Sequence, residues 1–126
     1  MSSRVLVADD AAFMRQMIRE IIEPEGYEIV GEATDGVEVV ESFEELHPDL
    51  VLMDIVMPRC SGLDAVRKIV AKHASARIVM CSALGQETLV MEALQAGAQD
   101  FIVKPFKPDA VVETLKKVLE KPVQSD

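Results

Sequence analysis

The stretch LVLMDIVMPRCSG, residues 50–62, contains four consecutive apolar residues that end at the carboxylate of Asp54. A continuous apolar run of this length is typical of a parallel strand that is buried on both faces. Pro58, Ser61 and Gly62 then supply residues that favour turns, and a helical pattern begins at Leu63. The stretch therefore predicts a buried strand over 50–53, with Asp54 at the point where this strand leaves the core.

Short apolar runs alternate along the chain with longer segments of helical periodicity. The predicted strands are 4–8, 28–33, 50–53, 77–81 and 100–103. The predicted helices are 11–23, the segment between an Asp35 cap and His47, 63–72, 86–96 and 108–121. Five strand–helix units predict an α/β fold, a doubly wound parallel sheet with helices on both faces.

The 126 residues fit one domain, 1–126, in which we expect 122–126 to be a frayed tail. In the first predicted helix, the apolar positions 13, 14, 17, 18, 21 and 22 mark one helical face. No secretory segment precedes the first strand, and the two cysteines lack metal-ligand spacing, which predicts a reduced, cytoplasmic protein. A net charge of −9 and the short apolar runs argue against nucleic-acid and membrane partners.

Polar residues follow all five predicted strands, Thr34 and Asp35 among them, and at four of the five ends they are residues that a phosphoryl-transfer site would use. Asp9 and Asp10 follow the first strand, Asp54 the third, Ser82 the fourth and Lys104 the fifth. In open α/β sheets, chemistry collects beyond the carboxyl ends of the strands. Each residue alone has a simpler interpretation as a helix cap, a turn residue or a solvated side chain. Together they predict one site of carboxylates, a hydroxyl and a lysine.

The same positions carry motifs that resemble the receiver domain of two-component response regulators. The motifs are Asp9-Asp10, Asp54 with Met57-Pro58 and Gly62, Ser82-Ala83, and Lys104-Pro105-Phe106. Residues 9–15 (DDAAFMR), 80–86 (MCSALGQ) and 97–106 (GAQDFIVKPF) are similar to the single-domain chemotaxis members of the family. The resemblance covers nearly the whole chain and implies a flavodoxin-like sheet with strand order 2-1-3-4-5.

The carboxylates of the predicted site repel one another unless a cation joins them. An oxygen-only ligand set suits Mg²⁺. The resemblance implies that Asp10, Asp54 and the backbone carbonyl of Val56 bind Mg²⁺ directly, while Asp9 acts largely through water. It also implies that Asp54 is the phosphoacceptor and that Lys104 neutralises the transferring phosphoryl group. Such a receiver promotes its own phosphorylation and dephosphorylation and is not otherwise an enzyme.

The resemblance further implies a switch, in which Ser82 moves toward the phosphoryl group and Phe101 turns inward with it. Ordinary packing of Phe101 on an edge strand is an equally defensible interpretation. The Lys104–Pro105 bond is cis in the family, whereas most bonds before proline are trans. Apolar Val56 and Leu84 stand where relatives often have polar side chains, and neither can orient an attacking water. This predicts that the acyl phosphate hydrolyses more slowly than in a Val56→Asn, Leu84→Glu double variant.

The implied partners are a CheA-like histidine kinase as phosphodonor, a possible phosphatase, and an output protein. The flagellar motor switch is the expected output partner, on the face formed by residues 86–96, 100–103 and 108–121. Two alternatives remain open from sequence. One is a phosphorelay receiver that passes phosphate to a histidine phosphotransfer protein. The other is an aspartate-based phosphohydrolase, which usually needs a cap or a second acid that the chain lacks.

Overall fold

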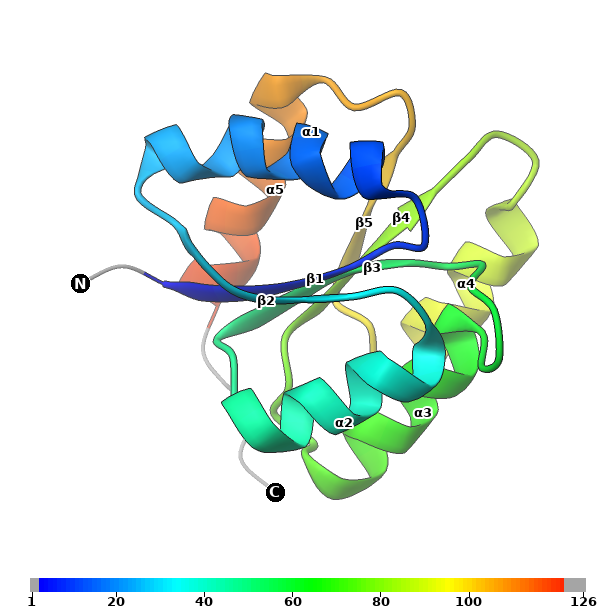
Figure 1. Ribbon diagram of the computed structural model, residues 1–126. Coiled ribbons are helices and arrows are strands. Elements are labelled where there is room, and N and C mark those ends of the chain that lie inside the picture. Colours follow the sequence, from blue (N-terminus) through cyan, green and yellow to red (C-terminus); the bar gives the residue numbers. More distant parts are fainter. Residues whose placement is uncertain (1–2, 122–126) are drawn as a thin grey trace.

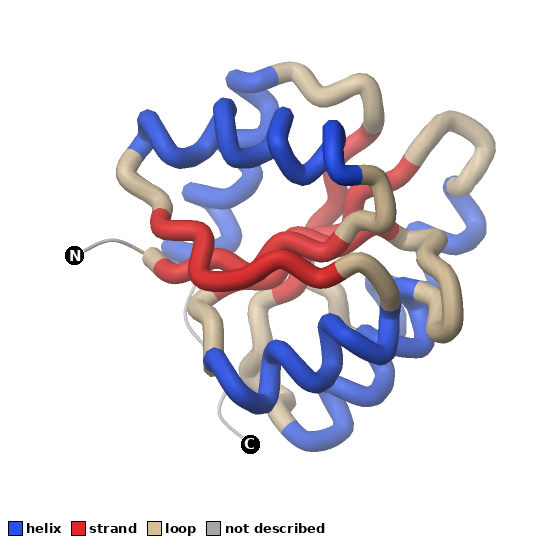
Figure 2. The backbone as a smooth tube through the Cα atoms, in the orientation of Figure 1, coloured by secondary structure: helices blue, strands red, loops and turns tan. Residues whose placement is uncertain are grey.

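The computed structural model of the chain describes residues 3–121 and contains one sheet of five parallel strands (Figures 1 and 2). The strand order is β2-β1-β3-β4-β5, which confirms the expected fold class and order. The strands are β1 (Arg4–Ala8), β2 (Glu28–Ala33), β3 (Leu50–Asp54), β4 (Ile78–Ser82) and β5 (Asp100–Val103). The tail predicted at 122–126 lies outside the described residues.

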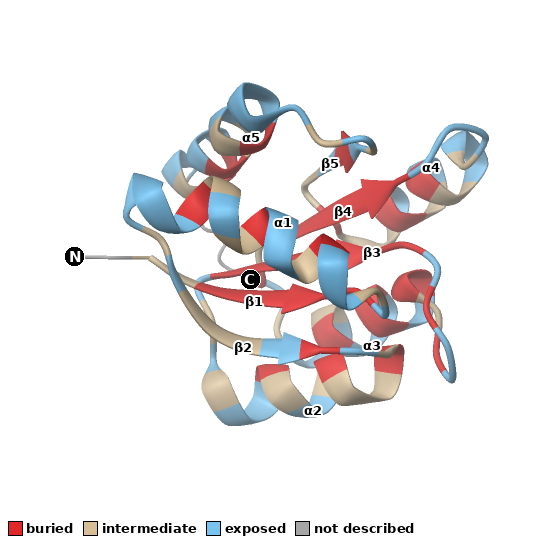
Figure 3. Cartoon of the chain, turned by 45° about the horizontal axis from the view of Figure 1, so that its top comes forward, coloured by how far each residue is buried: buried red, intermediate tan, exposed pale blue. Residues whose placement is uncertain are grey.

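Five helices cover the two faces of the sheet. They are α1 (Ala12–Ile22), α2 (Gly36–Leu46), α3 (Gly62–Lys72), α4 (Glu87–Ala96) and α5 (Pro108–Glu120). Helices α1 and α5 pack on one face, and α2, α3 and α4 pack on the other (Figure 1). The strands contribute to both apolar cores, and the red inner sides of the helices in Figure 3 face them. This layering leaves the two ends of the sheet open, so polar groups at the strand ends can reach solvent.

The element boundaries differ from the predicted ones at points that matter for the site. Strand β3 includes Asp54, and β4 runs one residue further than predicted, through Ser82. Asp54 is paired with Cys81, and Ser82 is paired with Val103 of β5. Both polar residues therefore belong to the ladder itself, which fixes their backbone more firmly than a loop would.

The apolar face predicted for α1 is only partly buried. Met14, Ile18 and Ile22 are buried, whereas the side chain of Phe13 is 69% exposed and Met17 is also exposed. The buried residues are spaced by four, which places them on one stripe of the helix. Phe13 and Met17 lie on a neighbouring stripe, where neither the sheet nor α5 covers them.

Candidate functional site

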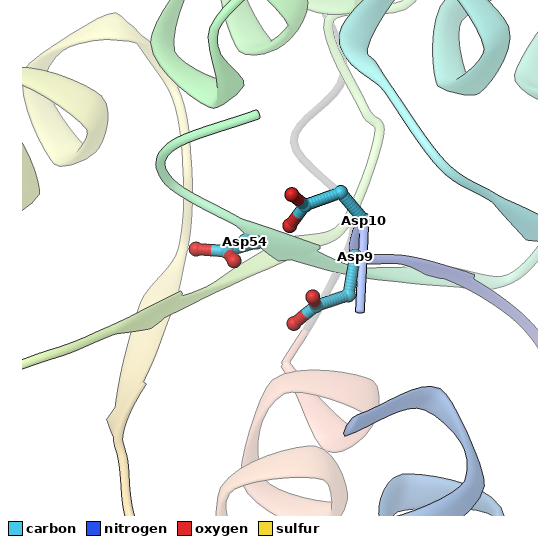
Figure 4. A group of neighbouring side chains, drawn as sticks. All are labelled: Asp9, Asp10 and Asp54. Carbon is cyan, nitrogen blue, oxygen red and sulfur yellow. The ribbon is translucent and has the colours of Figure 1, made fainter. Parts of the chain in front are cut away.

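Three carboxylates meet beyond the ends of two neighbouring strands. Ala8 of β1 is paired with Met53 of β3, so Asp9 and Asp54 follow in adjacent positions at one edge of the sheet. Carboxylate oxygens of Asp9, Asp10 and Asp54 all lie within 4.8 Å of one another, and Figure 4 shows them converging. Asp9 and Asp54 are buried, while Asp10 is exposed. The predicted acidic cluster is thus present, with one side open to solvent.

Lys104 reaches this cluster from the far side of β4. Its Nζ lies 3.1 Å from Oδ2 of Asp9 and 3.0 Å from Oδ2 of Asp54. Its backbone N–H donates to the carbonyl of Ser82 at 2.7 Å, which fixes the start of the loop after β5. Burial lowers the pKa of Lys104, but the hydrogen bonds and charges of Asp54 and Asp9 outweigh burial and raise it overall. The lysine is therefore a fixed positive charge between two carboxylates.

Asp54 is held in an environment that disfavours its charge. Burial raises the pKa of this carboxyl, and the hydrogen bond and charge of Lys104 offset this only in part. The Asp9 carboxylate adds to the rise, whereas the N–H of Val56, which donates to Oδ1 at 3.3 Å, opposes it. A further cation at the cluster would relieve this destabilisation. The oxygen ligands therefore fit a hard divalent cation.

Asp9 has little capacity left for direct metal binding. Its Oδ1 accepts the N–H of Ala11 at 2.9 Å, and its Oδ2 faces Lys104. The side chain of Asp10 makes no hydrogen bond to any residue within 3–121. Of the two neighbouring aspartates, Asp10 therefore has more free oxygen lone pairs, because each oxygen of Asp9 already accepts one hydrogen bond.

The sequence did not predict the role of Arg15 at this edge. The Nη1 of Arg15 donates to the backbone carbonyl of Asp9 at 2.6 Å, and its Nε pairs with Glu32 of β2 at 2.8 Å. Arg15 thereby ties the loop that carries Asp9 and Asp10 to the neighbouring edge strand. Its only sequence signal was its place within residues 9–15, because the contact depends on how α1 lies across the sheet.

The two proposed switch residues lie next to a small apolar hollow. Ser82 is buried at the end of β4, and Phe101 on β5 is 40% exposed. Both line a hollow of about 220 Å³ between β5 and the start of α4, together with Leu84, Val90 and Met91. The hollow therefore lies beside both residues, while the inward turn of Phe101 stays a prediction.

Two further site predictions concern backbone groups. The Lys104–Pro105 peptide bond is cis, as the resemblance implied. The side chain of Val56 is 51% exposed, while the role of its carbonyl as a metal ligand stays a prediction. Leu84 is also exposed, so neither of the two apolar residues noted in the sequence packs into the core.

A model of the response regulator receiver domain matches residues 5–116, and the chain therefore belongs to the response regulator receiver family. Among its relatives is the chemotaxis protein CheY of Thermotoga maritima, 56% identical over 118 residues, which are 94% of this chain and 98% of that protein. CheY of Bacillus subtilis is 52% identical over 119 residues, with 94% and 99% covered.

A solved relative is the CheX–CheY–BeF3–Mg²⁺ complex from Borrelia burgdorferi. It superposes with a TM-score of 0.90 at 36% identity, and the match covers 94% of this chain and 90% of that one. Within its family the chain is therefore CheY-like, a phosphorylation-activated response regulator of chemotaxis with an acidic site at Asp9, Asp10 and Asp54. Within residues 3–121, no helix has the length and apolar character needed to span a bilayer.

Proposed function

We propose that Asp54 of this CheY-like regulator accepts a phosphoryl group from a CheA-like histidine kinase. The chain would act as a single receiver domain in the cytoplasm. The observation that carries the proposal is the position of Asp54 itself. This buried carboxylate has a raised pKa, faces a lysine at 3.0 Å and is joined by two further carboxylates from the neighbouring strand. Perturbed carboxylates with a specific charged partner are typical of reactive sites.

Mg²⁺ would be held by Asp10, Asp54 and the backbone carbonyl of Val56, with Asp9 acting through water. The all-oxygen donor set and the free lone pairs of Asp10 support this assignment, as does the Mg²⁺ in the Borrelia burgdorferi complex. Bound there, the cation would supply positive charge opposite the phosphoryl oxygens. It would also remove the mutual repulsion that the three carboxylates otherwise impose on the folded chain.

The residues of the chain perform the transfer largely by position and charge. An oxygen of Asp54 forms a bond to phosphorus as the bond between phosphorus and the kinase histidine nitrogen breaks, and that nitrogen keeps the bonding electron pair. Lys104 lies close enough to Asp54 for its ammonium group to neutralise negative charge on the phosphoryl oxygens. The same arrangement would favour attack of water on phosphorus, in which the bond to the Asp54 oxygen breaks and inorganic phosphate leaves, so the domain promotes its own dephosphorylation too.

Phosphorylation would change the surface beside β5. The phosphoryl group adds roughly −1.5 to −2 charges and new acceptor oxygens, which would draw the hydroxyl of Ser82 inward. Phe101 would then turn into the hollow of about 220 Å³ that it already lines. Because Phe has no hydroxyl group, burial of the ring alone would favour this inward state. The change would remodel the face formed by α4, β5 and α5.

That face is the proposed docking surface for the output partner. Met91, Phe101 and Val103 expose apolar side chains on it, an arrangement that favours a protein partner. The flagellar motor switch is the proposed partner in chemotaxis, and a phosphatase is a further proposed partner of the phosphorylated state. A phosphohydrolase function is disfavoured because Val56, an exposed apolar residue two positions past Asp54, cannot activate water.

The test is intact-mass measurement after incubation with Mg²⁺ and a small phosphodonor or the kinase. We expect a gain of one phosphoryl group, which Asp54→Asn or removal of Mg²⁺ by a chelator abolishes. Asp64→Asn, at an exposed position in the first turn of α3, is the matched control and should keep the gain. A mass gain in Asp54→Asn equal to that of the parent chain would move the phosphorylation site elsewhere.

The output partner needs a separate binding experiment. The beryllofluoride-activated chain and Asp54→Asn are compared for binding to a purified flagellar switch component and to a histidine phosphotransfer protein. Activation-dependent binding to the switch component supports the chemotaxis output. Binding only to the phosphotransfer protein would instead make the chain a relay receiver.

A further inference from the structure

Helices α2 and α3 lie side by side on one face of the sheet and both end at a histidine (Figure 1). His47 is the C-terminal cap of α2, and His73 is the C-terminal cap of α3. Both helices start near the carboxyl ends of the strands and run back, so the two histidines lie at the end of the sheet opposite Asp54. Helix C-termini carry partial negative charge and favour cations.

The two imidazole rings are neighbours, and one of them, that of His73, bonds to a carboxylate. Their centres are 6.2 Å apart, and the ring planes meet edge to face at 80°. The Nε2 of His73 lies 2.9 Å from Oε1 of Glu44, which is on the last turn of α2. The ring of Phe43, 5.0 Å from that of His73, packs beside it and limits its rotation. His47, His73 and Phe43 line a surface hollow of about 250 Å³, and Glu44 lies outside its lining.

We propose that His47, His73 and Glu44 form a second metal site, for Zn²⁺ or another transition metal that prefers imidazole ligands. Two imidazoles and a carboxylate are a common donor set for Zn²⁺, with water in the fourth position. From Zn–N distances near 2 Å, the centres of two coordinating rings lie roughly 5–6 Å apart, close to the spacing observed here. The all-oxygen cluster at Asp54 has the opposite preference, for Mg²⁺.

Within residues 3–121, only the acidic cluster already brings three ligand atoms within 4.8 Å of one another. The ligand atoms of His47, His73 and Glu44 are further apart, so the His47 ring would have to turn toward the other two when the metal binds. His47 is exposed, and its ring makes no hydrogen bond to any residue in that range, so its side chain is free to change rotamer. Arg77 borders the same hollow, but its Nη2 is engaged by the carbonyl of Lys121 at 2.8 Å.

The backbone offers a matched variant for this histidine. His47 has φ 47°, a left-handed conformation that Gly and Asn most often supply at helix ends. The backbone therefore does not itself require an imidazole at this position. His47→Asn should keep the helix end while removing one metal ligand. Likewise, the amide of His73→Gln can still donate a hydrogen bond to Glu44.

The experiment is calorimetric titration with Zn²⁺ while excess Mg²⁺ occupies the acidic cluster. We expect one Zn²⁺ per chain and a loss of affinity of at least about tenfold in His47→Asn and in His73→Gln. Mutation of residues that only hydrogen-bond to metal ligands already lowers metal affinity by about 10–100-fold. Asp54→Asn and Cys60→Ser should bind Zn²⁺ as the parent chain does.

A second readout separates ligand loss from misfolding. Zn²⁺ should raise the melting temperature of the parent chain clearly more than that of the two histidine variants, while all three melt alike without metal. Unchanged affinity in the His47→Asn, His73→Gln double variant, or loss of binding in Asp54→Asn, would overturn the site. Co²⁺ absorption with a thiolate charge-transfer band would overturn it too, because it would assign the metal to cysteine.

Discussion

Two carboxylates in neighbouring parts of the sheet respond in opposite ways to a cationic partner. Glu32, on edge strand β2, pairs with Arg15 at 2.8 Å and with Arg19. Asp54, on central strand β3, pairs with Lys104 at 3.0 Å. The pKa of Glu32 is lowered, chiefly by the hydrogen bond from Arg19, whereas that of Asp54 is raised because burial outweighs its lysine.

The difference teaches that burial, not the presence of a cation, decides whether an ion pair stabilises this fold. At the edge, water solvates the Glu32 pairs and little desolvation opposes them. At the centre, Asp54 loses most of its water and regains only part of that energy from Lys104. The edge carboxylate thus stabilises the fold modestly, while the central one is kept reactive at a cost in stability that the two apolar cores offset.

The largest effect should come from two glycine-to-alanine variants, which test how tightly the backbone near each carboxylate is packed. A Cβ at Gly62 would lie 2.3 Å from the carbonyl oxygen of Asp54 and 2.8 Å from Cα of Ile55, so the end of β3 would have to move. At Gly31 of β2, the closest atom would be the end of the Leu46 side chain, at 2.7 Å, which can change rotamer. We expect Gly62→Ala to lower the free energy of unfolding by about 3 kcal/mol and Gly31→Ala by about 1 kcal/mol.

Urea denaturation of the two variants measures this difference. Phosphoryl acceptance provides a second measurement, which should fall in Gly62→Ala and stay near the parent value in Gly31→Ala. Equal losses of stability would mean that the backbone around Asp54 is no more constrained than that of the edge strand, and the contrast would then rest on charge alone.

The pattern of strands and helices was predictable because continuous apolar runs are typical of buried strands and apolar stripes of helical period are typical of amphipathic helices. The meeting of Asp9, Asp54 and Lys104 followed from their places at the strand ends once a parallel sheet was assumed. The contact between Arg15 and the Asp9 carbonyl was not predictable, because it depends on how α1 crosses the sheet. The exposure of Phe13 was missed for a related reason, since periodicity marks apolar positions without showing which of them a neighbour covers.

Removal of the central charge should make the fold more stable. Because the folded pKa of Asp54 is raised, stability is lost as pH rises through that pKa, and the ionised carboxylate destabilises the fold at neutral pH. We expect Asp54→Asn, with a chelator present, to raise the free energy of unfolding at pH 7 by about 1 kcal/mol, with solvent screening at the open site limiting the gain.

The pH dependence makes this prediction specific to the charge. The two chains should become equally stable as pH falls toward 3.8, the ordinary pKa of an aspartate, because the parent carboxyl is then protonated as well. Urea midpoints measured between pH 4 and 8 follow this convergence. A less stable Asp54→Asn at pH 7 would show that the bond to Lys104 outweighs the cost of burial.

The smallest effect should come from the edge carboxylate, with the opposite sign. Because the folded pKa of Glu32 is lowered, its contribution is fully present above the ordinary value of 4.5 and is lost as pH falls through the folded pKa. We expect Glu32→Gln to lower the free energy of unfolding at pH 7 by about 0.5 kcal/mol, and less in 1 M salt, because exposed ion pairs are screened.

The matched control for this variant is Glu20→Gln on α1, an exposed glutamate that forms no ion pair with any residue in 3–121 and should change stability little. The same urea titrations apply, repeated at low and high salt. If Glu32→Gln stabilised the chain at pH 7, as Asp54→Asn should, the two carboxylates would behave alike. Burial could then no longer explain why Glu32 stabilises the fold whereas Asp54 destabilises it and is the reactive carboxylate.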